Sequence, residues 1–324
     1  MKFSIKAFIA GVILSVLFVS VKNIYSCELS AQADKGVYRA LKIGRLDNLY
    51  IGSSMFRKGI TLYDDKSESF LIYYNGLDPV NEAVILEYLF KNGLKVKNLY
   101  VDMFAYTAAK DSWLYDMRLM FDSPLELKLS VCNLALKNPE AGYFSSSWEM
   151  LVRAENDMFI LWPLYNKLTA KRYYRGGYSA DTFNRGLTHD AMALITPQKS
   201  EALKMNRAQR EAIIRIIELC REYNVNVIFA ETPKYKGLEG DDGYRAVMSE
   251  YFGLLRDYGV KCIISRKTLD NINASAGENV YTYDFSYEEP SMFEDYIHLS
   301  TEGSRKFMSV LRDVLRDIQR SNDM

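Results

Sequence analysis

The amino-acid sequence predicts an α/β domain in which a mostly parallel sheet is covered by helices on both faces. Two observations predict this class. Short apolar segments alternate with amphipathic helical segments, and glycines or polar residues follow the apolar segments. Because parallel strands need crossover connections, the alternating helices come to lie over the sheet. With 324 residues, 48% of them hydrophobic, the chain is long enough to bury a large core.

Local patterns predict each strand and helix. Asp78 and Pro79 suit the N-cap and the first position of a helix, and Cys220 continues the apolar stripe of another. The predicted strands cover residues 49–51, 70–74, 98–103, 225–230 and 260–264. The predicted helices cover residues 78–92, 200–223, 244–258 and 301–318. The alternation is interrupted at about residues 105–195, where we expect a helical insertion that caps or flanks the site.

Charge and composition argue against several function classes. Lys plus Arg and Asp plus Glu both number 41, so no net charge would hold the chain on nucleic acid. The widely spaced Cys132, Cys220 and Cys262 form neither a disulfide framework nor a zinc motif, and we interpret them as core residues. We therefore expect no metal and no cofactor. Only His189 and His298 can supply an imidazole, and we assign no role to His189.

The N-terminal segment has the pattern of an export signal. Lys2 and Lys6 precede an uncharged apolar run over residues 7–21, and positive charge before such a run directs the following chain out of the cytoplasm. We predict a signal peptide or membrane anchor over residues 1–26. Lipidation of Cys27 is a third alternative, because the residues before it resemble a lipobox.

The predicted location depends on whether this segment is cleaved. An anchor would hold the protein at the outer face of a bacterial cytoplasmic membrane, and cleavage would make it periplasmic or secreted. Residues 27–45 are expected to be a linker, and residues 46–324 the α/β domain with its insertion.

A reactive serine is expected at the carboxyl edge of the sheet, where open parallel sheets bind ligands. Ser54 follows the first strand at a turn into a helix, where backbone N–H groups stabilise negative charge. Its hydroxyl needs a base, and His298 is one of two candidates. Asp295, three residues before His298, can orient the imidazole and stabilise its protonated form. The sequence thus contains the parts of a catalytic triad.

Two motifs resemble the first and last blocks of the SGNH/GDSL hydrolase superfamily. The first is Ile-Gly-Ser-Ser at residues 51–54, and the second is Asp-Tyr-Ile-His-Leu-Ser at residues 295–300, followed by Gly303. The resemblance extends over about residues 46–104 and 196–320. It implies a three-layer α/β/α fold with a five-stranded, mostly parallel, flavodoxin-like sheet.

The resemblance also implies roles for the matching residues. Ser54 would be the nucleophile, and Asp295 and His298 would complete the triad. Backbone N–H groups of Ser54 and Gly76 would form the oxyanion hole. Ser53 stands where many family members carry Asp, and the motif alignment prefers Ser54 over Ser53 as the residue that points into the site.

One part of the family pattern is missing. The third block usually carries an Asn that donates to the oxyanion, whereas this chain has Asp102 there, and an ionised carboxylate cannot donate. Tyr106, Thr107 or a group from the insertion are candidates for the third donor; alternatively, the hole has two donors. Asn75, Asp102, Tyr106 and Thr107 are all candidate substrate contacts.

The expected function is extracytoplasmic ester hydrolysis or acyl transfer through an acyl-Ser54 intermediate, with O-acetyl esters of an envelope polysaccharide as substrate. Two alternatives stand beside it. The missing Asn favours a non-catalytic binding or assembly module in polysaccharide biogenesis, and a membrane tether favours a lipid-directed esterase or acyltransferase. Aromatic residues of the insertion would either stack on sugar rings or form the core of a helical subdomain.

Overall fold

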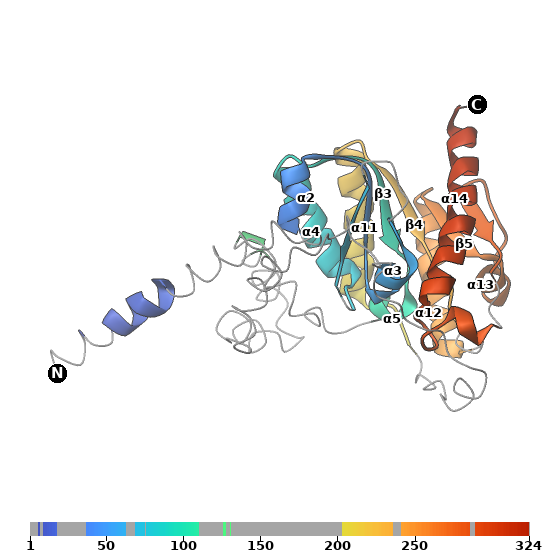
Figure 1. Cartoon of the computed structure of the whole chain (residues 1–324), viewed down its shortest axis with the longest axis horizontal. Helices are drawn as coiled ribbons and strands as arrows, with labels where there is room; N and C mark the ends of the chain where they lie inside the picture. The colour runs from blue at the N-terminus through green and yellow to red at the C-terminus, as the bar shows by residue number, and fades with distance from the viewer. Residues whose placement is uncertain are drawn as a thin grey trace.

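The computed structural model describes most of the α/β domain and a short part of the N-terminal segment (Figure 1). The described residues are 6, 9–17, 37–62, 69–74, 76–109, 126–127, 130, 203–235, 241–285 and 289–323. Some sequence predictions lie outside them, namely those for Cys27, Asn75, Cys132, His189 and most of the insertion at about 105–195.

The sheet of the described domain has six strands, all parallel, in the order β2-β1-β3-β4-β5-β6 (Figure 1). The strands are β1 (Arg45–Gly52), β2 (Ser69–Tyr73), β3 (Lys95–Asp102), β4 (Asn226–Ala230), β5 (Lys261–Ser265) and β6 (Val280–Tyr283). The predicted α/β class is confirmed. The predicted number of five strands is wrong, because β6 adds an edge strand beside β5. β6 has only four residues, three of them partly exposed, so it lacks the apolar run of a central strand.

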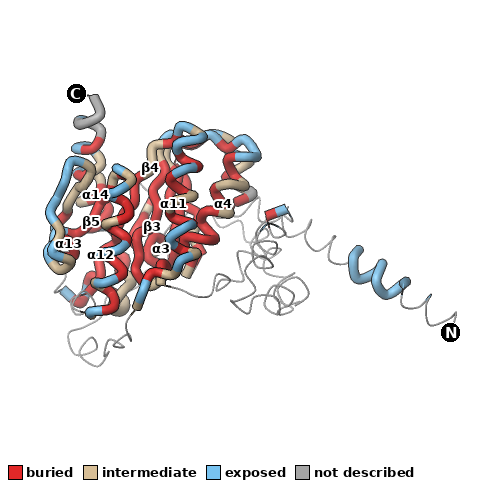
Figure 2. The backbone as a smooth tube through the Cα atoms, turned by 180° about the vertical axis from the view of Figure 1, so that it is seen from behind, coloured by how far each residue is buried: buried red, intermediate tan, exposed pale blue. Residues whose placement is uncertain are grey.

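Helices cover both faces of this sheet (Figure 1). They are α2 (Val37–Ile43), α3 (Ser54–Gly59), α4 (Pro79–Lys91), α5 (Ala105–Ala108), α11 (Arg207–Glu222), α12 (Asp242–Asp257), α13 (Arg266–Asn271) and α14 (Thr301–Asp323), with a 3-10 turn, η2 (Pro290–Met292). Successive residues of β1 point to opposite faces. Leu49 and Ile51 join a core with α2, α4, α11 and α12, whereas Tyr50 joins a second core with α3 and α14. The buried strands between these helical layers are visible in Figure 2.

The helix ends follow local capping. The Asp78 side chain accepts a hydrogen bond from the N–H of Asn81, which confirms the predicted start of α4. The predicted start of the second helix at residue 200 is wrong, because Asn206 caps α11 and the helix begins at Arg207. Cys220 is 1% exposed, as its place on the apolar stripe predicted.

The predicted linker over residues 27–45 is wrong for its second part. Val37 and Ala40 lie three residues apart on α2, are fully buried and belong to the same core as α4. Gly44, with a φ of 74°, turns the chain into β1. The packed domain therefore includes residues 37–43, which were expected to belong to the linker. This helix has seven residues and no acidic residue in its first turn, so its sequence signal is weak.

The strand order reverses at β1, and this reversal positions the site. The chain passes from β1 to β2 on one side and then to β3 on the other. Such a reversal opens a crevice at the carboxyl ends of the two central strands. Ile51 pairs with Val101, so the turn after β1 and the end of β3 lie next to each other.

Residues 9–17 of the N-terminal segment are helical, and their large apolar side chains are exposed. Within the part of the chain that the structure describes, no helix combines the length and the apolar character needed to cross a membrane. The export signal remains a prediction.

Candidate active site

Three side chains from distant parts of the chain form a hydrogen-bonded relay. His298 Nε2 lies 2.8 Å from Ser54 Oγ, and His298 Nδ1 lies 2.7 Å from Asp295 Oδ2. Ser54 and His298 are 244 positions apart in the sequence. The structure thus brings together the three residues that the sequence predicted. A serine hydroxyl in contact with an imidazole that a carboxylate holds can act as a nucleophile.

Hydrogen bonds within the loop between η2 and α14 hold Asp295 and His298 in place. Asp295 Oδ1 accepts hydrogen bonds from the backbone N–H groups of Ile297 and His298, each at 2.8 Å. The Glu294 N–H donates to the carbonyl oxygen of His298 at 2.8 Å. Asp295 therefore shapes the turn with one oxygen and holds the imidazole with the other.

The end of this loop is fastened to the start of α14. The Ser300 N–H donates to the Met292 carbonyl at 2.8 Å, and the Ser300 hydroxyl donates to the Ser291 carbonyl at 2.7 Å. The same hydroxyl accepts from the Gly303 N–H at 3.1 Å. A Cβ on Gly303 would lie 2.0 Å from the Met292 carbonyl oxygen. Glycine is therefore required where the helix crosses the loop.

The surroundings of Asp295 favour its charged form. Burial acts to raise its pKa, but the hydrogen bond from His298, the charge of His298 and the two backbone N–H groups outweigh burial, so the pKa of Asp295 lies below its ordinary value. The carboxylate is therefore ionised at neutral pH and can stabilise a protonated His298. The side chains of His298 and Asp295 are 21% and 43% exposed, so the relay is open to solvent.

Gly52 lets the turn after β1 lie against the end of β3. A Cβ on Gly52 would come 2.4 Å from the Cβ of Asp102 and 3.0 Å from the Cγ of Phe56. The φ of Gly52 is not positive, so close packing requires glycine here, and the backbone conformation does not.

Ser53 is buried and caps α3, whereas its neighbour Ser54 is partly exposed and faces His298. The Ser53 hydroxyl accepts from the Met55 N–H at 3.1 Å and donates to Asp102 Oδ2 at 2.5 Å. The Ser53 N–H donates to the same carboxylate oxygen at 3.1 Å. Both polar groups of Ser53 thus hold the turn that presents Ser54.

Asp102 has a different position from the one we expected. We expected a substrate contact, but its side chain is 3% exposed and accepts both of its hydrogen bonds from Ser53. Burial raises the pKa of Asp102 to about 6, although the hydrogen bonds from Ser53 and the charge of Lys234 act to lower it. The residue therefore supports the serine turn from within the protein.

The two described candidates for the third oxyanion donor make different contacts. The Thr107 hydroxyl donates to the Phe104 carbonyl at 2.8 Å, and Thr107 is 4% exposed. The Tyr106 ring packs against Tyr244, with ring centroids 5.7 Å apart. Thr107 therefore uses its proton inside the protein, which argues against Thr107 as the third oxyanion donor.

Gly76 lies in the turn after β2 with a φ of 70°, a conformation that glycine adopts readily. The Tyr74 N–H donates to the Gly52 carbonyl at 3.3 Å, which holds this turn beside the turn of Ser54. The role of Gly76 as an oxyanion donor remains a prediction. The other candidate of this turn, Asn75, lies outside the described residues.

An ion pair that the sequence did not reveal joins the two halves of the site. Lys58 Nζ lies 2.9 Å and 2.7 Å from the two carboxylate oxygens of Glu294. Lys58 is one helical turn after Ser54, and Glu294 precedes Asp295. Their side chains are only 12% and 19% exposed, and they are 236 positions apart in the sequence. No local pattern could have predicted this pair.

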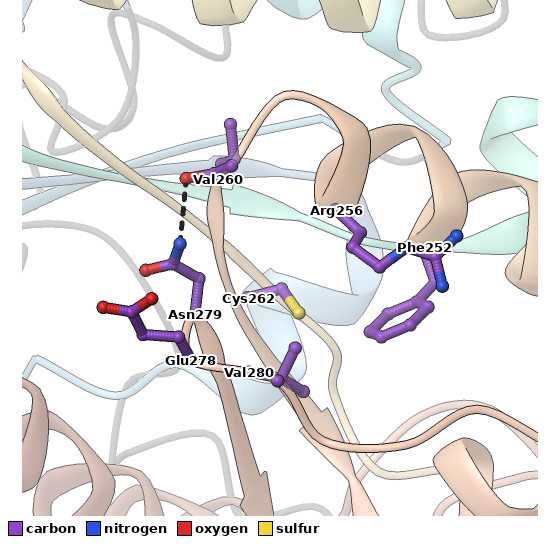
Figure 3. Close-up of a pocket in the computed structure, with 9 residues that line it drawn as sticks. Phe252, Arg256, Val260, Cys262, Glu278, Asn279 and Val280 are labelled. Atoms are coloured by element: carbon purple, nitrogen blue, oxygen red, sulfur yellow. Dashed lines mark hydrogen bonds between the residues drawn. The ribbon is translucent and has the colours of Figure 1, made fainter.

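A small cleft lies at the opposite end of the strands from Ser54, at the starts of β5 and β6 (Figure 3). It holds about 100 Å³ and is lined by α12 residues such as Phe252 and by Val260, Cys262 and Val280. Burial raises the pKa of the Cys262 thiol to about 12, so this thiol is not a nucleophile. Among the described residues no group of three or more His, Cys, Asp or Glu could hold a metal ion.

Comparison of the sequence with protein-family models and with curated proteins finds no match. The site is therefore defined by its geometry. That geometry comprises a serine at a strand-to-helix turn, a histidine on its hydroxyl and a carboxylate on the other ring nitrogen.

Proposed function

We propose that this protein is an SGNH-type serine esterase or acyltransferase that acts through an acyl-Ser54 intermediate. The observation that carries the proposal is the relay from Asp295 through His298 to Ser54, with contacts of 2.7 and 2.8 Å. In this mechanism His298 Nε2 accepts the hydroxyl proton while Ser54 Oγ attacks the ester carbonyl. The protonated His298 then gives the proton to the leaving alcohol.

The second half of the reaction releases the acyl group. A water or an acceptor hydroxyl gives its proton to His298 and attacks the acyl-Ser54 carbonyl. The bond between this carbonyl and Ser54 Oγ then breaks, and His298 returns the proton to Ser54 Oγ as the acid or the new ester leaves. The choice between water and an alcohol acceptor distinguishes a hydrolase from a transferase. The backbone N–H groups of Ser54 and Gly76 are the proposed oxyanion donors, each worth a few kcal/mol of transition-state stabilisation.

The proposed substrate is an O-acetyl ester of an envelope polysaccharide. This part of the proposal follows from the export pattern of residues 1–26 and from the resemblance to the SGNH/GDSL hydrolases. The export pattern would place the domain outside the cytoplasmic membrane, and the resemblance implies an ester substrate.

A second candidate is a binding or assembly module without turnover. The position of Asp102 favours it, because a carboxylate that accepts hydrogen bonds occupies the place where a third oxyanion donor is expected. This candidate predicts an unreactive Ser54.

The test is the reaction of the full-length protein, purified in mild detergent, with a fluorophosphonate probe and with p-nitrophenyl esters. We expect stoichiometric labelling that Ser54→Ala abolishes, and faster hydrolysis of acetate than of octanoate. Ser265→Ala, which removes a buried serine at the end of another strand, is the matched control and should retain labelling. A folded wild-type protein that is neither labelled nor active would support the binding module, and a preference for octanoate would support a lipid-directed enzyme.

Separating Lys58 from Glu294 should reduce the reactivity of Ser54. We expect Lys58→Met or Glu294→Gln to lower kcat for the acetyl ester about tenfold with little change in KM. Each change removes the ion-pair partner of a nearly buried charge and weakens the link between α3 and the loop of His298. Steady-state kinetics on both variants measure the effect.

The double variant Lys58→Glu/Glu294→Lys reverses both charges and should regain part of the lost rate, because the pair can form again. Lys91→Met, which breaks the exposed pair between Lys91 and Glu87, is the control and should leave kcat unchanged. Equal rates in wild type and in Lys58→Met would show that the pair has no positioning role.

A further inference from the structure

A buried serine that caps a helix and binds a buried acid occurs twice at the carboxyl edge of the sheet. The Ser265 hydroxyl accepts from the Thr268 N–H at 2.9 Å, and the Ser265 N–H donates to Glu231 Oε2 at 3.0 Å. Ser53 makes the same two kinds of contact, as N-cap of α3 and as donor to Asp102. Ser53 and Ser265 are each 1% exposed. In both cases the acid comes from the neighbouring strand, at its end or directly after it.

The two acids differ in how their charge is balanced. Glu231 Oε1 lies 2.5 Å from Lys234 Nζ and accepts from the Thr268 hydroxyl at 2.8 Å. Asp102 has Ser53 as its donor, and its Oδ1 is buried without a hydrogen-bond partner in the described part of the chain. A buried carboxylate with an unsatisfied oxygen is costly. The arrangement at Ser53 is therefore the less stable of the two.

The other groups around Asp102 do not remove this cost. Glu82 from α4 is 1% exposed, Tyr251 from α12 is fully buried, and Glu231 adds a further negative charge against the positive charge of Lys234. Burial, followed by the charges of Asp102 and Asp78, raises the pKa of Glu82 well above its ordinary value.

The Asp102 carboxylate at the turn of Ser53 is costly to bury, whereas the equivalent carboxylate of Glu231 is neutralised by Lys234. This difference points to a functional reason for keeping an acid at residue 102. We propose that Asp102 is a positioning residue that fixes Ser54 by holding both the N–H and the hydroxyl of Ser53. Charge-assisted hydrogen bonds are roughly twice as strong as neutral ones, so the ionised acid holds the first turn of α3 most firmly. The inference rests on the proposed role of Ser54.

The test compares Asp102→Asn, Ser53→Ala and the double variant in the full-length protein. We expect each single change to slow fluorophosphonate labelling of Ser54 about tenfold. The double variant should lose no more than the larger single loss, because both residues act through one link. A double variant that loses the product of the two single losses would overturn the proposal.

Thermal unfolding separates positioning from a structural role. Burial gives Asp102 a pKa of about 6 in the folded protein, above its ordinary value of 3.8, so its ionisation destabilises the fold increasingly as the pH rises between these two values and by a constant amount above them. Asp102→Asn should therefore melt at or above the wild-type temperature at pH 8, with the difference shrinking towards pH 5, while labelling is slow. Slow labelling with a lower melting temperature at pH 8, or unchanged labelling, would overturn the proposal. Ser265→Ala, the matched control, should melt lower and label at the wild-type rate.

A second readout does not depend on catalysis. The chain has two histidines, so in a His189→Gln background the ring nitrogen NMR signals belong to His298 and report its contact with Ser54. Loss of this contact in Ser53→Ala and Asp102→Asn supports the positioning role, and its persistence in both overturns it. A wild-type protein that is not labelled but shows the contact would refute the proposed function alone.

Discussion

Replacing His298 with glutamine should lower ester hydrolysis by about 1,000- to 10,000-fold. The imidazole is the group within reach of the Ser54 hydroxyl, at 2.8 Å, and glutamine can keep a hydrogen bond there but cannot accept a proton at neutral pH. KM should change little, because the loss falls on proton transfer in the transition state. Steady-state kinetics with an acetyl ester and the rate of fluorophosphonate labelling measure the effect.

Asp295→Asn tests the same relay from its other end. An amide at this position can favour the wrong tautomer of His298, so we expect a loss of similar size. Residues that act as one unit are not additive, and the double variant should be no slower than the worse single variant. His189→Gln is the control for histidine content and should keep its rate. Wild-type turnover in His298→Gln would rule out the proposed mechanism.

Gly303→Ala should destabilise the domain and disable the site together. The new methyl group would lie 2.0 Å from the Met292 carbonyl oxygen and 3.1 Å from Leu299 Cδ2, so the start of α14 and the loop of His298 must separate. Overpacking of this kind costs about 1–3 kcal/mol or more. We expect a melting temperature several degrees lower, and slow labelling of Ser54 even in the folded fraction.

Gly253→Ala is a matched control within the same domain. Gly253 lies in α12, and a Cβ there would have no atom within 4 Å. Alanine is a better helix former than glycine by roughly 0.5–1 kcal/mol, so this variant should be more stable than wild type. Replacing glycine with alanine is thus expected to raise the stability at residue 253 and to lower it at residue 303. A Gly303→Ala protein as stable as Gly253→Ala would contradict the steric argument.

The residues of the relay could be predicted because each has a local signal. Ser54 follows a short apolar strand and a glycine, and His298 stands three residues after an acid, before an amphipathic helix. A parallel sheet then directs both signals to one edge. The strands that were predicted are those with apolar runs, and β6 was missed because most of its residues are partly exposed.

The supporting contacts could not be predicted, because they depend on the packing of distant segments. Lys58 and Glu294 look like ordinary surface residues until α3 meets the loop before α14. Asp102 ends its strand in a position that fits a substrate contact equally well. Only the folded structure shows that the end of β3 lies against Gly52 and that the Asp102 carboxylate turns towards Ser53. Side-chain pairing across the sheet edge is set by tertiary geometry and leaves no periodic trace in the sequence.

The separation of Ser54 from His298 by 244 positions also bears on how the protein is made. A ribosome delivers the serine early, and domains fold as units once their chain is available. In the proposed mechanism, Ser54 would lack its base until the loop of His298 and α14 have been synthesised and packed. The proposed mechanism therefore predicts that nascent chains, and chains truncated before His298, are unreactive at Ser54.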